Sequence, residues 1–340
     1  MDHCRIKSRP GRIIQIQVRT VRGPLFQEGY RPHLTGHQTF PLRYGWLKKV
    51  FDEVSATETQ DENKSVFLHE SAIARFGVGK NMVASMRHWA SAAGIIVEAR
   101  DSPHIRTTKL GRLLFGSRGF DLYMENPATL WLIHWHLAAR TQKTTWFWAF
   151  NYFPAQTFER EQLIDGIQRI ASLLNWTRVS STTIRKDVAC FIRTYVAQQP
   201  PKQSLSDGFL ESPLTELGLV KANGPSNGFR FVRGPKMTLD DGVFAYALLD
   251  FWSRYSGNTA TLSFEAIAHE PGGPGRVFLL DENHVADRLA TLEDVTKGML
   301  RWNETAGLKQ VVRDPDLAFS MKLSFVSSGY RGSSEALKAA

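Results

Sequence analysis

Residues 67–115 contain the pattern that most constrains the fold: two short helical segments on either side of a glycine turn. The first predicted helix covers 69–76 and the second 80–93. Gly77-Val78-Gly79 separates them, and glycine permits the positive φ that a tight corner between helices often needs. Gly94 ends the second helix. The side chains expected to face inward are Ala72, Ile73, Phe76, Val83, Met86, Trp89 or Ala90, and Ala93.

A strand pair and a third helix follow. The apolar runs at 95–99 and 105–107, joined by a turn that contains a proline, predict the two strands of a wing. Thr107 or Thr108 can cap a short helix that runs through Leu114. This order of elements predicts a winged helix-turn-helix domain.

A further helix is predicted just before this unit. Pro41 fits its first turn, and the acidic stretch 52–62 that follows the helix is predicted to be a loop. The apolar side chains with helical spacing are Leu42, Trp46, Leu47, Val50 and Val54.

Two later segments resemble the first unit. Met86-x-x-Trp89-x-x-x-Ala93-Gly94-Ile95 matches Met299-x-x-Trp302-x-x-x-Ala306-Gly307-Leu308, which predicts a helix that stops at Gly307 and leads into a strand at Val311-Val312. A chance match is the alternative, because alanine, glycine and an apolar residue commonly follow a helix.

The middle copy is fainter. It has an amphipathic helix over 158–174, a turn at Trp176-Thr177 and a second helix over 183–196 that Ser180 or Ser181 can cap. A break rich in proline and glutamine at 198–204 separates these helices from their wing. The wing strands are expected at 216–220 and 228–232.

The expected fold class is mainly α with small β wings, built as tandem winged helix-turn-helix modules. Residues 128–153 contain eight aromatic side chains. We interpret them as a helical core that joins the modules, in preference to the alternative of a platform on which bases stack. The expected organisation is a basic N-terminal extension (1–32), a first winged helix-turn-helix domain (33–120), an aromatic-rich helical region with a second such module (121–235), a C-terminal helical or winged-helix-like domain (236–325) and a flexible tail (326–340).

Positive charge is concentrated near the N-terminus. The chain has 42 basic and 33 acidic residues, a net charge of +9. Residues 1–50 contain ten basic residues and two acidic ones, and 71–118 contain eight and two. Clustered positive charge indicates a polyanionic partner such as nucleic acid, or else a basic surface that only maintains solubility. Residues 1–32 are either an arm that touches DNA backbone or an extension outside the domain.

Several classes of protein are excluded. Two cysteines, Cys4 and Cys190, are too few for a disulfide framework or a cysteine zinc site. The longest uncharged runs, 126–139 and 144–158, fall short of the roughly 18–20 apolar residues of a membrane span. No secretory signal opens the chain. We therefore expect a reduced, soluble, cytoplasmic protein with no membrane partner.

Motifs for ATP and metals are incomplete. A phosphate loop that ended at Gly79-Lys80 would need glycine at 74 and Ser or Thr at 81, where the chain has Ala74 and Asn81, so no ATP site is expected. His134 and His136 point about 200° apart on a helix and could share a metal only on a strand. Asp281, Glu282 and Asp287 could hold Mg²⁺, although acids at a helix N-terminus also complement its dipole.

Most of the candidate DNA-binding residues lie on the second helix, on the wing or just after the wing, and two lie on the helix before this unit. The N-terminal half of such a helix enters the major groove, and the wing reaches flanking backbone. Near the first helix, His37 and Arg43 are candidates for phosphoryl-transfer chemistry, with the alternative that Arg43 holds backbone and His37 satisfies a turn. The residues assigned to DNA binding are Lys48, Lys49, Lys80, Asn81, Ser85, Arg87, His88, Arg106, Lys109 and Arg112.

Three stretches go beyond a generic winged helix, at 36–49, 76–89 and 212–219. Gly36-His37-x-Thr39-Phe40-x-Leu42-Arg43, Phe76-Gly77-Val78-Gly79-Lys80-Asn81-Met82-Val83 and Ser212-Pro213-Leu214-x-Glu216-Leu217-Gly218 resemble signatures of the SspB-type family of bacterial proteins. Its genes lie beside those of phosphoadenosine-phosphosulfate-reductase-like enzymes. The resemblance covers about 33–325.

The resemblance implies a protein that binds duplex DNA and nicks one strand, so that sulfur can replace a non-bridging phosphate oxygen in an anti-phage phosphorothioation system. The implied partners are the reductase-like enzyme, an ATPase and a cysteine desulfurase, and the implied location is the nucleoid. No catalytic residue is carried over. The alternatives are a non-catalytic DNA-binding scaffold for the sulfur-transfer complex and a winged-helix transcriptional regulator.

Overall fold

The structure is a computed structural model, and it describes residues 23–330 except 61–62, 69, 99–101, 103, 198–210, 225–227 and 306. It is mainly helical with three small antiparallel sheets, as predicted. Among the described residues no helix is both long enough and apolar enough to cross a bilayer. The predictions for 1–22, for the break at 198–204 and for the end of the tail at 331–340 lie outside the described residues.

The first unit has the predicted order of elements. After the helix α1 (Trp46–Thr57) and the short 3-10 helix η2 (Asn63–Phe67) come α2 (Glu70–Phe76), α3 (Lys80–Ala92), the hairpin β1 (Ile96–Glu98) and β2 (Ile105–Thr107), and α4 (Lys109–Phe115). Gly77 and Gly94 both have positive φ, which the turn and the helix end require. Thr108 caps α4 by accepting a hydrogen bond from Gly111 N.

The burial of this unit confirms most of the predicted inward face. Val83, Met86, Trp89, Ala90 and Ala93 of α3 and its end are all at most 2% exposed. The residues before α3 that were predicted to face inward and are buried are Leu42, Trp46, Leu47, Val50, Val54, Ala72 and Phe76.

Three details of the first unit differ from the sequence prediction. Ile73 is 44% exposed and lines a groove, because α2 has only two turns and packs its other side on α3. The first helix begins at Trp46, so Pro41 lies before it. The same helix continues through Thr57 into the stretch predicted to be a loop, where Val54 and Thr57 are buried.

The middle of the chain supplies the aromatic core. Trp131, Trp135 and Trp146 are fully buried on α5 (Pro127–Ala138) and α6 (Thr144–Asn151), as the core prediction requires. The following elements are β3 (Thr157–Glu159), α7 (Arg160–Leu173), α8 (Ser181–Tyr195), the 3-10 helix η4 (Pro213–Leu217), β4 (Val220–Ala222) and β5 (Gly228–Phe231). Ser180 caps α8, one of the two caps that the sequence offered.

The C-terminal part corrects the predicted repeat. The elements are α9 (Asp241–Tyr255), β6 (Thr261–Ser263), α10 (Phe264–His269), α11 (Pro274–Val277), α12 (Glu282–Ala290), α13 (Leu292–Val295), β7 (Leu300–Thr305), β8 (Leu308–Arg313) and the 3-10 helix η5 (Phe319–Tyr330). Met299–Leu308 is therefore a strand and a hairpin turn instead of a helix that ends at Gly307. Ala306 lies outside the described residues. The match to 86–95 was a chance match.

A different repeat exists at the level of topology. The sheets β3-β5-β4 and β6-β8-β7 have the same antiparallel order, in which the last strand lies in the middle and helices stand between the first strand and the hairpin. In the first unit the place of the outer strand is taken by Asn63. Its side-chain Nδ2 donates to Ile105 O and its Oδ1 accepts from Ile105 N, both at 2.7 Å.

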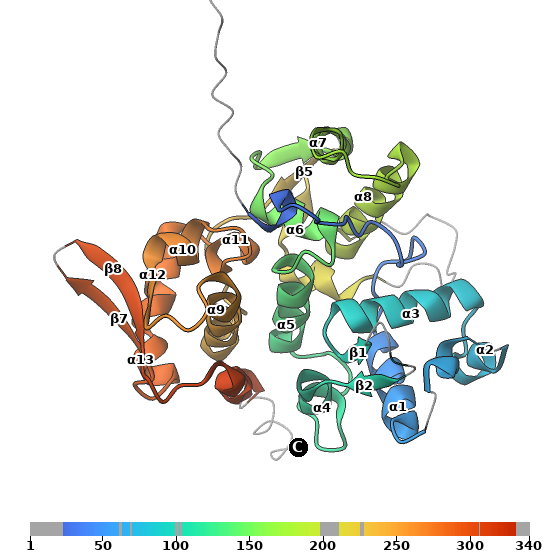
Figure 1. Ribbon diagram of the computed structural model, residues 1–340, viewed down its shortest axis with the longest axis horizontal. Coiled ribbons are helices and arrows are strands. Elements are labelled where there is room, and N and C mark those ends of the chain that lie inside the picture. Colours follow the sequence, from blue (N-terminus) through green and yellow to red (C-terminus); the bar gives the residue numbers. More distant parts are fainter. Residues whose placement is uncertain are drawn as a thin grey trace, which may run out of the picture.

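Figure 1 shows how these parts are arranged around α5 and α9, which run side by side near the centre. The first unit lies on the α5 side, and the β7–β8 hairpin lies beyond α9. The segment before α1 is part of this packing. Leu25 of the 3-10 helix η1 (Pro24–Phe26) is fully buried, and the Tyr30 hydroxyl lies 2.7 Å from Thr144 Oγ1. The predicted N-terminal extension 1–32 thus includes a stretch that is packed on the core.

Candidate functional site

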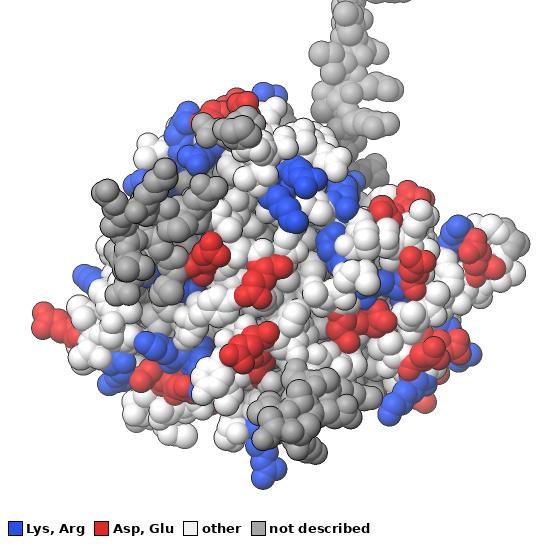
Figure 2. All heavy atoms as spheres, turned by 180° about the vertical axis from the view of Figure 1, so that it is seen from behind, with Lys and Arg blue, Asp and Glu red and all other residues white. Residues whose placement is uncertain are grey.

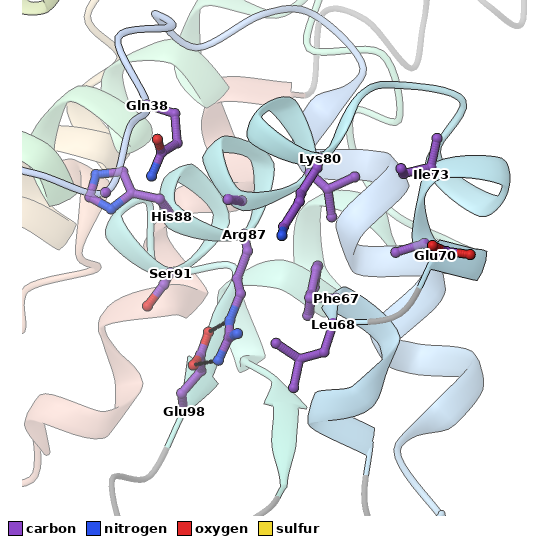
Figure 3. A pocket seen from close by; sticks show the side chains of 14 residues that line it. Gln38, Phe67, Leu68, Glu70, Ile73, Lys80, Arg87, His88, Ser91 and Glu98 are labelled. Atoms are coloured by element: carbon purple, nitrogen blue, oxygen red, sulfur yellow. Dashed lines mark hydrogen bonds and ion pairs between the residues drawn. The ribbon is translucent and has the colours of Figure 1, made fainter.

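The outer face of α3 borders a groove of about 800 Å³. Figure 3 shows Lys80 and Arg87 on this side of α3, with Leu68 and Glu98 across from Arg87 and His88 toward one end. Lys80 and Asn81 are exposed at the N-terminus of α3, as predicted. The free N–H groups of a helix N-terminus favour an anion, so Lys80 is placed to meet a phosphate.

Two other residues of α3 do not face outward as predicted. Ser85 is fully buried and its hydroxyl donates to His37 O at 2.9 Å, so its predicted outward position was wrong. His88 is half-buried, and its Nε2 lies 3.0 Å from Lys143 Nζ. Burial and the neighbouring Lys143 charge hold the pKa of His88 well below its ordinary value. Both residues lie against the segment that contains His37, whose ring is 6.1 Å from that of His88.

Arg87 is held in an ion pair. Its Nε and Nη2 donate to the two carboxylate oxygens of Glu98 at 2.9 and 2.6 Å, and its guanidinium lies over the Phe67 ring. The hydrogen bonds to Glu98 raise the pKa of Arg87 against the effect of burial. A bidentate pair of this kind is strong and fixes orientation. It joins α3 to β1 and engages two of the five N–H donors of Arg87.

The remaining predicted contacts lie on the surface of the same unit. Arg106 on β2 and Lys109 at the start of α4 are exposed. Arg112 is exposed and donates to Thr107 O at 2.8 Å. On α1, Lys48 pairs with Asp52, and Lys49 Nζ lies 3.4 Å from Phe76 O.

His37 lies in a buried polar cluster with Asp187 and Lys143. The His37 Nε2 is 2.8 Å from Asp187 Oδ1, and the His37 Nδ1 accepts from Thr39 N at 2.9 Å. Since Nδ1 accepts, the proton is on Nε2, and both ring nitrogens are engaged. Asp187 is fully buried, with Lys143 Nζ 3.9 Å from the same oxygen.

The other members of this cluster are also enclosed. Lys143 is 1% exposed and lies over the rings of Trp89 and Trp146. Burial lowers its pKa and Asp187 opposes that shift. Burial raises the pKa of the nearby Cys190 thiol to about 12, so this thiol is inert as a nucleophile. Arg43 is half-buried, and its guanidinium lies over the rings of Phe40 and Trp46. A role of His37 and Arg43 in phosphoryl transfer stays a prediction.

A second exposed basic helix end was not predicted from the sequence. Thr182, Arg185 and Lys186 are exposed on the first two turns of α8, which follows α7 as α3 follows α2. Beside them is a pocket of about 630 Å³ whose lining includes Arg31 and Arg178, and none of the described residues that line it is acidic. The signal was present in Ser180–Lys186, where hydroxyl and basic side chains follow a capped helix start.

The residues proposed to hold magnesium are not assembled into a cage. Asp281 caps α12, accepting from His284 N at 3.0 Å, and this hydrogen bond lowers its pKa. Glu282 lies 3.0 Å from His269 Nε2, and Asp287 lines a separate surface hollow with Arg288. Within the described ranges no three His, Cys, Asp or Glu side chains are grouped as metal ligands. Asp281 thus has a helix-capping role and Glu282 lies in the first turn of α12, and a magnesium site at these carboxylates stays a prediction.

The two histidines of α5 are bonded to protein groups. His134 lies 2.8 Å from both the Tyr195 hydroxyl and Val277 O, and the Nε2 of His136 lies 2.9 Å from the Tyr246 hydroxyl. The prediction that they stand on a helix, pointing apart, is confirmed.

Charge is mixed on the face opposite to that of Figure 1. Figure 2 shows Asp and Glu side chains scattered among Lys and Arg over the described part of that surface. The net positive charge of the chain is thus not spread as one field over that face, and local groups of basic residues have to carry any polyanion binding.

Comparisons with known proteins identify a matching family and two solved structures with a similar fold. The model of a family described as "Protein of unknown function (DUF4007)" matches residues 34–327. A magnesium ion-bound SspB crystal structure is similar with a TM-score of 0.75 and 30% sequence identity. A second SspB crystal structure has a TM-score of 0.74 and 29% identity, and each similarity covers 87% of both chains. A search of curated proteins finds no match.

Proposed function

The chain belongs to the DUF4007 family and is an SspB-type protein, and from this premise we propose that it binds duplex DNA and nicks one strand in a phosphorothioation system that defends against phage. Sulfur would then be incorporated at the nick. The partners in this proposal are duplex DNA, a phosphoadenosine-phosphosulfate-reductase-like enzyme, an ATPase and a cysteine desulfurase.

The observation that carries the DNA-binding part is the pair of exposed basic helix ends. Lys80 and Asn81 on α3 follow α2 across the turn at 77–79, and Arg185 and Lys186 on α8 follow α7 across the longer connection at 174–180. Helix-turn-helix proteins insert the N-terminal half of the second helix into the major groove. We interpret the three small sheets as the wings of three winged-helix modules, in support of which two sheets share one strand order.

Nicking is the part of the proposal that rests on the family. Supercoiled plasmid offers a direct assay, because one nick relaxes the molecule completely. The purified full chain is expected to convert supercoiled plasmid to the open circular form, and the assay should be run with and without Mg²⁺. If plasmid stays supercoiled in both conditions while duplex DNA is bound, the nicking part of the proposal fails.

A non-catalytic scaffold is the second candidate, and one observation favours it. Both nitrogens of His37 are occupied by Thr39 N and Asp187, so this histidine would have to break a hydrogen bond before it moved a proton. A scaffold would bind DNA, leave plasmid supercoiled, and increase sulfur incorporation only together with its partners.

A further inference from the structure

A buried carboxylate is surrounded by three cations where α5, α9 and η5 meet. Asp250 is 2% exposed on α9. Its Oδ2 accepts from Trp135 Nε1 at 3.0 Å and pairs with Arg254 at 3.2 Å. Its Oδ1 accepts from Arg140 Nη2 at 2.9 Å and from Lys322 Nζ.

Positive charge exceeds negative charge in this group. Burial alone would raise the pKa of Asp250, but Arg140, Arg254 and Lys322 together lower it far below its ordinary value. The carboxylate is therefore ionised and compensates one of the three cations. Arg254 has further donors engaged by the backbone, since its Nε donates to Asp250 O and its Nη1 to Ala139 O. The uncompensated charge lies with Arg140 and Lys322, which converge on the same oxygen.

These two side chains line a cavity of about 650 Å³. Its wall brings together the end of α5, η5, the end of α3 with β1, and the start of α4. Lys109 and Gln142 also line it, and the acidic residue on its wall, Glu98, is already paired with Arg87. Arg140 is 30% exposed and is bonded to Asp250 through its Nη2, and a guanidinium has five N–H donors, so donors remain for a ligand.

We infer that this cavity binds a phosphate monoester through Arg140 and Lys322, with Lys109 contributed by the start of α4. A phosphate monoester carries close to two negative charges at pH 7 and three acceptor oxygens, which matches two surplus cations better than the single charge of a backbone diester. The guanidinium can bind phosphate oxygens with two parallel hydrogen bonds. Asp250 holds Arg140 and Lys322 in place, so little side-chain freedom is lost on binding.

The phosphate has two possible sources: the terminal phosphate of a DNA strand, such as one side of a nick, or a free nucleotide. The inference does not depend on nicking or on the helix ends that are proposed to bind duplex DNA.

Isothermal titration of the full chain tests it with paired probes. AMP is compared with adenosine, and 5′-phosphorylated trithymidylate with the same oligonucleotide without its terminal phosphate. We expect binding of at least one phosphorylated probe, about tenfold or more tighter than its unphosphorylated partner, the effect of losing charge-assisted hydrogen bonds. Equal binding of AMP and the phosphorylated oligonucleotide would assign the site to any phosphate monoester, and binding of the oligonucleotide alone would assign it to a strand end.

Variants connect this binding to the cavity. Lys322→Gln should weaken the phosphorylated probe about tenfold, with Asp250 still paired to Arg140 and Arg254. Lys109→Gln removes a cavity charge without touching Asp250 and should also weaken it, which keeps the test decisive if Lys322→Gln unfolds. Lys309→Gln, an exposed residue of the β7–β8 hairpin, is the matched control and should have no effect.

The inference is overturned if neither phosphorylated probe binds better than its partner, or if Lys109→Gln and folded Lys322→Gln behave like Lys309→Gln. Duplex binding is measured for the same proteins and for a further variant, Lys80→Gln. Loss of duplex affinity in Lys80→Gln with unchanged AMP or oligonucleotide binding would show that the two sites are separate.

Discussion

At the scale of single residues, the buried charges of this protein are held by specific partners. Asp187 has His37 and Lys143, while Asp250 has three cations and an indole N–H. A buried ion is costly without such partners. Arg254 follows Asp250 by four residues on α9, a spacing that a helix predicts. The other partners come from distant parts of the chain, so no spacing rule could have predicted either group as a whole.

His37→Ala distinguishes a catalytic histidine from a structural one. The substitution leaves Asp187 buried with only Lys143 nearby, and breaking a buried pair typically costs about 3–5 kcal/mol. We expect a clear loss of stability in urea unfolding, with nicking per folded molecule changed less than about tenfold. A loss of about 10²–10⁴-fold in nicking at unchanged duplex affinity would instead make His37 a general acid or base.

Arg87 and Glu98 give a matched pair of variants with opposite expected signs. Arg87→Gln should weaken duplex binding by about 1–3 kcal/mol if the side chain reads a base. Glu98→Gln releases Arg87 from its bidentate pair and should strengthen binding. Fluorescence anisotropy with a labelled duplex measures both. If both variants weaken binding equally, the pair acts only by fixing the hairpin against α3.

At the scale of elements, the sequence predicted the helices and hairpin of the first unit because each boundary has its own local signal. Gly77, Gly94 and Thr108 end or begin elements through backbone geometry and capping. The predicted helix at Met299 failed because its apolar spacing also suits a strand, and tertiary pairing with β8 decides the outcome. Asn63 could not be predicted to replace a strand, since its bonds to Ile105 depend on the tertiary fold.

The helix α5 predicts a specific response to acid. Burial lowers the pKa of His134 to about 4 and that of His136 to about 3. The unfolded chain takes up these protons below about pH 6.5 and the folded chain does not, so stability is lost as the pH falls from 6.5 toward 4. Each histidine contributes up to about 1.4 kcal/mol per pH unit. Urea unfolding at pH 7 and pH 5 should show a smaller pH effect for His134→Gln than for the parent, and equal pH effects would contradict the buried neutral histidine.

The ends of α3 and α8 are expected to act as phosphate contacts. Lys80→Gln and Lys186→Gln should each weaken all duplex sequences alike, because a phosphate contact carries no base information. Each should reduce the salt slope of binding by about 0.9. Lys309→Gln provides the control for a lost surface charge. If a variant keeps the affinity and the salt slope of the parent, its helix lies outside the DNA interface.

At the scale of the whole molecule, the packing of the N-terminal segment changes what a truncation should do. The sequence predicted that 1–32 is either an arm that touches DNA backbone or an extension outside the domain. The structure buries Leu25 completely and bonds Tyr30 to Thr144, and loss of one buried leucine side chain alone costs about 2–5 kcal/mol. Deleting 1–32 should therefore lower the Tm by several degrees relative to deletion of 1–22. Equal Tm values would show that this packing contributes nothing.

The account as a whole rests on phosphate contacts from local basic groups, and the salt dependence of duplex binding tests this most directly. Log Kd for a labelled random duplex should be measured against log salt concentration for the full chain. Five exposed cations, Lys80, Arg106, Lys109, Arg185 and Lys186, predict a slope with a magnitude of about 4 to 5. A slope close to zero, or the absence of duplex binding at low salt, would contradict the account.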